Sequence, residues 1–136
     1  MSASKALAVA VRALVPAGVT HHVGQAPTGA TLPWLVTNQS VPDVDSRSEA
    51  GTPHGQVGRV RLTAAAGTEN GTLDLLDVVL PAFEGARVSV AGWVTSPLRR
   101  LGEVRVYPDF DVTLTGGIHP MVGSALFEYT VTATGG

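Results

Sequence analysis

The chain has no cysteine, and this absence removes several classes of site at once. Without a thiol there is no disulfide framework, no cysteine nucleophile and no cysteine zinc site. Charged residues make up only 15% of the chain, and the formal net charge of −2 argues against a dedicated binder of the nucleic-acid backbone. No apolar run approaches the roughly 20 residues that a membrane-spanning helix needs. We expect no secretory signal near the amino end, because Arg12 interrupts the apolar stretch there.

Lysine and aromatic residues are also scarce. Lys5 is the only lysine, so arginines carry the other positive charges. We attribute this bias to a GC-rich genome, although the planar arginine side chain also suits protein interfaces. Two Trp, two Tyr and three Phe are too few for a surface that stacks bases, and we expect Trp34 and Trp93 to lie in the core. The 16 Gly and 9 Pro, with 44% hydrophobic residues, predict one loop-rich domain over residues 1–136.

The first part of the chain predicts a helix and two strands. Apolar residues at helical spacing form one stripe of a short amphipathic helix that should end near residues 16–18. The stripe consists of Leu7, Val11 and Leu14. Residues 19–23 predict a short strand, and residues 32–38 predict a strand that is apolar on both faces. A strand of the second kind belongs in the interior of a sheet.

Residues 40–55 differ from the segments on either side. They are rich in acidic, serine, proline and glycine residues and have almost no periodicity, so we predict a long polar loop at about residues 40–56. Val41 and Val44 are its only apolar anchors. Long loops in compact domains are usually functional or mobile, and the sequence favours neither a functional loop nor a solvated connection.

Residues 57–65 show the clearest strand alternation in the chain. Val60 and Leu62 fall on one predicted face, and Arg59 and Arg61 fall on the other. We interpret the two arginines mainly as an exposed strand face. The alternative is that they contact a neighbouring subunit.

A second helix is predicted after a turn at residues 67–71, with Asn70 or Thr72 as its N-cap. Its predicted inner stripe consists of Leu73, Leu76, Leu80 and Phe83. Three further apolar positions widen the apolar arc beyond what one sheet face requires, and these are Leu75, Val78 and Val79. Pro81 should end or kink the helix near Leu80.

The last third of the chain is rich in short strand patterns separated by proline and glycine. The predicted strands cover residues 87–90, 92–95, 103–107, 111–115 and 125–134. The last strand alternates regularly, with Phe127, Tyr129 and Val131 expected to face inward and Glu128, Thr130 and Thr132 outward. The resulting order of elements is α-β-β-loop-β-α, followed by this closing run of strands. It predicts an α+β fold, a mainly antiparallel β-sheet with two α-helices packed on one face and a long polar loop between strands.

The histidines and serines do not form a recognisable catalytic or metal motif. His21 and His22 are neighbours on a predicted strand and should face opposite sides, and no pair has the spacing of helical metal ligands. His54 and His119 are therefore also expected to bind no metal. Ser124 lacks the second glycine of a hydrolase nucleophile elbow, and no glycine-rich segment has P-loop spacing. We expect no enzyme activity and no cofactor.

The order, length and spacing of the elements resemble those of a known family. Three segments carry the resemblance: Leu32-Pro33-Trp34-Leu35-Val36, the helical stripe Leu73-Leu76-Leu80, and the last strand Ser124-Ala125-Leu126-Phe127-Glu128-Tyr129-Thr130-Val131. Over roughly its full length the chain resembles the tail terminator (tail completion) proteins of long-tailed bacteriophages.

This resemblance implies a structural virion protein without enzyme activity. Its α+β subunits would form a homohexameric ring that caps the tail tube, stops tube elongation and joins the tail to the head-side connector or head-closure protein. DNA would pass through the lumen without specific binding, and no membrane would be involved. The protein would be located in the neck of the virion, and in the host cytoplasm during assembly. The alternatives are another neck or tail component, such as a head-closure or tail tube subunit, or a small metal-binding or enzymatic domain that uses the histidines.

Ring assembly would need surfaces that contact a neighbouring subunit or the tube. We expect the polar loop to supply one, with two apolar anchors and with charges that set the register of the contact. The candidate interface residues are Val41, Val44, Asp45, Arg47, Glu49, Arg59 and Arg61.

Overall fold

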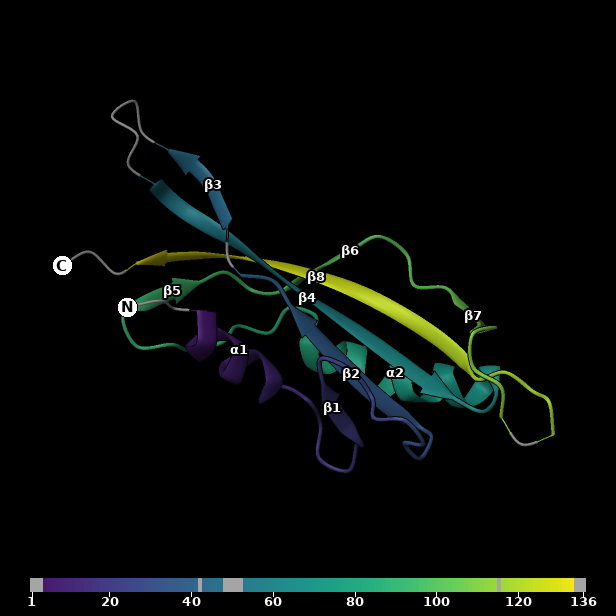
Figure 1. Cartoon of the computed structure of the whole chain (residues 1–136). Coiled ribbons are helices and arrows are strands. Elements are labelled where there is room, and N and C mark those ends of the chain that lie inside the picture. The colour runs from purple at the N-terminus through teal and green to yellow at the C-terminus, as the bar shows by residue number, and fades with distance from the viewer. Residues whose placement is uncertain (1–3, 42, 48–52, 115, 134–136) are drawn as a thin grey trace.

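The computed structural model describes residues 4–41, 43–47, 53–114 and 116–133 (Figure 1). Within these ranges the chain forms two helices and an eight-stranded, mostly antiparallel sheet. The elements in chain order are α1 (Ser4–Arg12), β1 (His21–Val23), β2 (Trp34–Gln39), β3 (Asp43–Arg47), β4 (Pro53–Ala66), α2 (Glu69–Phe83), β5 (Trp93–Thr95), β6 (Arg99–Leu101), β7 (Val106–Pro108) and β8 (Met121–Ala133). The predicted α+β class is therefore confirmed.

Two long antiparallel strands, β4 and β8, form the centre of the sheet, and shorter strands share their outer edges. β3 and β2 pair with successive parts of β4. β5, β6 and β7 pair with successive parts of β8, because proline and glycine interrupt the chain between them. β1 pairs with β2 in parallel, which places β2 in the interior of the sheet as predicted.

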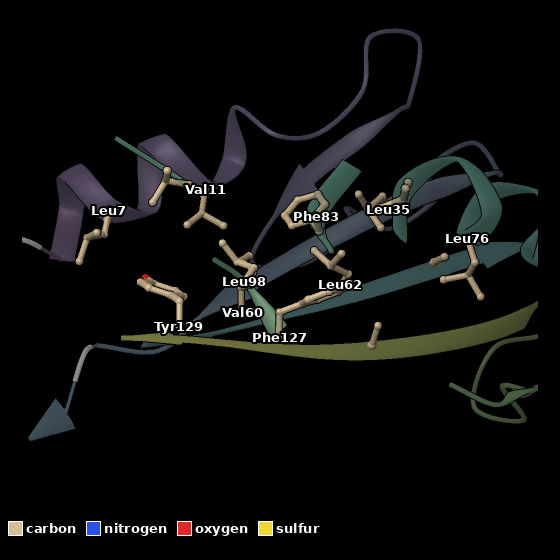
Figure 2. Packing of buried hydrophobic residues seen from close by; sticks show 14 of the residues in the cluster. Leu7, Val11, Leu35, Val60, Leu62, Leu76, Phe83, Leu98, Phe127 and Tyr129 are labelled. Carbon is tan, nitrogen blue, oxygen red and sulfur yellow. The ribbon is translucent and has the colours of Figure 1, made fainter. Parts of the chain in front are cut away.

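The core lies between the two helices and one face of this sheet (Figure 2). Leu7 and Val11 of α1 and Phe83 of α2 point toward the sheet, where alternate residues of β4 and β8 meet them. The Phe83 and Phe127 rings lie with their centroids 5.9 Å apart. The predicted inward faces of residues 57–65 and of the last strand are thus confirmed, as is the predicted packing of both helices on one face.

The second helix begins, turns and ends differently from the prediction. Thr68 is its N-cap, and the Thr68 side chain accepts a hydrogen bond from the Gly71 backbone N–H. The buried positions are Thr72, Leu76, Val79 and Phe83, so Leu73 does not belong to the inner stripe. Several apolar stripes compete on this helix, and packing against β4 and β8 buries only one of them.

Pro81 does not end the helix, which continues through Phe83. The ring removes only one backbone donor, and the next turn still closes because the Glu84 N–H donates to the Leu80 carbonyl at 2.9 Å. The chain leaves the helix at Gly85, whose φ of 76° lies in the left-handed region that favours glycine.

The predicted long polar loop at residues 40–56 is wrong for most of its length. Residues 43–47 form β3, and β4 already begins at Pro53, so the segment is an antiparallel pair with irregular register. Figure 1 shows this pair, which we call the arm (residues 43–47 and 53–57), extending beyond the body of the sheet and away from α2. Strand pairing depends on backbone hydrogen bonds, and the polar sequence gave no apolar alternation that would have predicted it.

The strands of the last third are also partly corrected. Residues 87–90 contain only an isolated bridge between Val90 and Trp93, and residues 111–114 form no strand. Residue 115 lies outside the described residues, as does Thr134 at the end of the last predicted strand. β6 was not predicted, since Arg99 and Arg100 lack an apolar alternation.

Candidate functional site

The arm carries three of the seven predicted interface residues. Val41 precedes it and is 75% exposed. Val44, Asp45 and Arg47 all lie on β3, at the free edge of the pair that β3 forms with β4. Glu49 lies outside the described residues. The backbone thus brings three of these residues together on one short strand.

Arg59 and Arg61 lie on the face of the sheet that is turned away from the helices, because Val60 and Leu62 point into the core. Arg59 Nη2 lies 2.9 Å from Glu128 Oε2. Glu128 Oε1 also accepts a hydrogen bond from Arg99 Nη2 at 3.1 Å. One carboxylate on β8 therefore bridges an arginine on each neighbouring strand.

Arg61 lies in the next row of the same face. Its partner across the strands is Leu126, which in turn pairs with Leu101 of β6. Arg61 is exposed, and no carboxylate lies within ion-pair distance of it among the residues whose side chains the structure describes. We call Arg59, Arg61, Arg99, Leu101, Leu126 and Glu128 the basic sheet face. It combines three arginines with one carboxylate around two half-buried leucines.

The exposed side of α2 has the opposite charge. The helix contains Glu69, Asp74 and Asp77 and has no basic residue. Val78 and Leu73 lie among these carboxylates and are 53% and 41% exposed. We call Leu73, Asp74, Asp77 and Val78 the acidic helix face. In the described part of the chain none of its carboxylates is engaged in an ion pair.

The described histidine side chains do not converge on one site. His21 and His22 face opposite sides of the sheet, since they pair with Leu35 and Val36. His21 Nε2 lies 2.9 Å from Thr37 Oγ1, whereas the buried Nε2 of His22 has no hydrogen-bond partner. Burial lowers the pKa of His21, and the positive charge of Arg12 and the neighbouring His22 lower it further. His119 lies far along the chain and its Nδ1 contacts the Val112 carbonyl at 2.6 Å.

Within the described ranges no three histidine or acidic side chains are grouped as metal ligands. The side chain of His54 lies outside what the structure describes. A metal centre would need at least three such ligands, together with groups that orient them.

The surface hollows are mainly apolar and hold no grouping of nucleophile and base among the described residues. One, of about 690 Å³, lies between α1 and residues 89–91, and Val9 is among its lining residues. Another, of about 470 Å³, lies where residues 26–34 meet residues 109–122. Such hollows lack the convergent polar groups that a small-molecule site uses to orient its ligand.

Sequence reasoning missed Arg99 and Glu128 as members of a site. They lie 29 residues apart in the chain and meet only because β6 pairs with β8. The short Arg99–Leu101 strand has no alternation that would reveal this pairing. The regular alternation of the last strand placed Glu128 on the outer face, and that was the one available signal.

Comparisons with protein families and with curated proteins identify no relative of this chain. No protein-family model matches the chain, and no curated protein matches it significantly. Neither helix in the described part of the chain has the length and apolar character needed to cross a membrane.

Proposed function

We propose that this chain is a structural subunit of a bacteriophage tail terminator. In this role identical subunits form a ring that caps the tail tube, stops its elongation and presents a surface to the head-side connector. The observation that carries the proposal is the fold, in which two helices cover one face of a curled, mainly antiparallel sheet (Figure 1). This is the architecture that the sequence resemblance implies.

The exposed surfaces support a role in assembly. The arm extends from the sheet with polar and charged residues on β3, and Val41 at its base is largely exposed. We expect it to contact a neighbouring subunit or the last ring of the tube, with Val41 and Val44 as apolar anchors. Asp45, Arg47 and Glu49 would then set the register of that contact more than its strength.

Native mass spectrometry of the purified chain tests this proposal. We expect a species of six times the 14.0 kDa subunit mass, and closed rings in negative-stain images. A chain that stays monomeric at high concentration would contradict the proposal. Stacked rings that grow into tubes would instead identify a tail tube subunit, and stoichiometric metal by elemental analysis would point to a metal-binding domain.

A further inference from the structure

We propose that the acidic helix face of one subunit docks on the basic sheet face of a second copy of the chain. The inference rests on the proposed function, and it deepens that function by naming the two surfaces that join neighbouring subunits. Each subunit would thus bind one neighbour through its acidic helix face and a second neighbour through its basic sheet face.

The charges of the two faces are complementary. The basic sheet face has Arg59, Arg61 and Arg99 against one carboxylate, and that carboxylate is already bound by two of the arginines. Arg61 has no carboxylate partner among the described side chains of its own subunit, so its positive charge is not neutralised there. Asp74 and Asp77 are in the same condition on a helix without any basic residue. Opposite charges of this kind steer association and fix its register.

Each face also exposes apolar side chains beside its charges. On α2 these are Leu73 and Val78, which lie on either side of the two aspartates and each within one helical turn of one of them. On the sheet they are Leu101 and Leu126, which are paired across β6 and β8. Burying these side chains against each other would supply affinity, whereas the neighbouring charges would supply specificity.

The two faces lie on opposite sides of the subunit, and this fixes the kind of symmetry. α2 covers one side of β4, while Arg59 and Arg61 project from the other. A contact between two different surfaces of identical chains is heterologous, and it repeats around a closed ring when the rotation between subunits permits. A two-fold contact would instead place like charges against each other.

Charge reversal tests the pairing of these faces. R61E leaves two arginines and two carboxylates on the basic sheet face, which removes its net positive charge, and the double variant D74R/D77R gives a subunit with two basic faces. We expect each variant alone to assemble only at roughly 100-fold higher concentration than the unchanged chain, because the attraction between the two faces is lost in R61E and becomes a repulsion in D74R/D77R. An equimolar mixture should form rings again, with the two variants alternating and three copies of each in every hexamer.

Two controls make the outcome decisive. R87E makes the same charge change at an exposed arginine outside both faces and should assemble like the unchanged chain. Circular dichroism melts of each variant show that its fold is intact, and recovery in the mixture shows this independently. If the unchanged chain forms rings and neither charge-reversal variant weakens them, the proposed contact between the two faces is wrong, although the proposed ring is not contradicted. If the unchanged chain stays monomeric, the proposed function fails as well.

Discussion

Gly58 shows how a single residue shapes the core. It lies directly opposite Tyr129 in the β4–β8 pair, and the tyrosine ring covers the space that a side chain at position 58 would occupy. A Cβ atom there would lie 2.5 Å from the Tyr129 Cζ atom. Tyr129 cannot easily move, because it is buried and extends toward Leu7 of α1 (Figure 2). Glycine at this position thus lets an aromatic ring join the sheet to the first helix.

We expect Gly58→Ala to lower the free energy of unfolding by about 1–3 kcal/mol, because the ring must shift within a packed core. Urea denaturation with a fluorescence readout measures the change. Gly67→Ala is the matched control, since a Cβ atom there meets nothing within 4 Å. That variant should be as stable as the unchanged chain or up to about 1 kcal/mol more stable. Equal stability of the two variants would show that Tyr129 is free to move.

His21 makes stability depend on pH. Burial, Arg12 and His22 all favour its neutral form, so the pKa of His21 in the folded chain lies below the ordinary value of 6.5. Between these two values the unfolded chain binds more protons than the folded chain. The contribution of His21 to the free energy of unfolding is therefore fully present above pH 6.5. It is lost as the pH falls below 6.5 and through the lower pKa of the folded chain.

His21→Gln should remove this part of the pH dependence, because glutamine does not titrate but can still reach Thr37 Oγ1. Thermal melts of both proteins at several pH values from 7 down to 5 measure the effect. We expect the melting temperature of the unchanged chain to fall more steeply than that of the variant. Parallel curves would assign the acid sensitivity to other groups.

At the scale of elements, the arm is where the sequence prediction failed most clearly. Its residues are polar, so the usual signal of strand alternation is absent, and residues 43–47 and 53–56 of the predicted loop are in fact paired strands. In β4 the alternation appears only where the strand crosses the core, from Val60 onward. Periodicity reports burial on one face, and it therefore cannot detect a strand that leaves the body of the protein.

Deleting residues 43–53 tests what the arm contributes. No described member of the core cluster lies between Leu35 and Val60, so we expect the free energy of unfolding to change by about 1 kcal/mol or less. Under the proposed function the shortened chain should form fewer hexamers, measured by native mass spectrometry. Val41→Ser serves as a milder variant that keeps the arm. Normal ring formation after the deletion would refute a docking role for the arm.

At the scale of the whole molecule, the fold could be predicted from the sequence wherever burial leaves a regular pattern of apolar residues. The α+β class, the inward faces of β4 and β8 and the interior position of β2 follow from apolar spacing. The inner face of α2 does not, because Leu73 and Val79 are both apolar and the spacing alone does not show which of them packs against the sheet. The basic sheet face escaped prediction as a unit because it exists only once β6, β8 and β4 are aligned.

The interrupted strands along β8 have a consequence for how copies of this chain can meet. A long, straight outer strand offers a row of free backbone amides and carbonyls to any similar strand, and such contacts tend to propagate without limit. Here that border is divided among three segments of three residues each. Pairing of this edge with a strand of another copy through backbone hydrogen bonds is therefore restricted, so contacts between copies on this side depend on side chains. Association through charged side chains weakens as the salt concentration rises, and it can close into an oligomer with a fixed number of subunits.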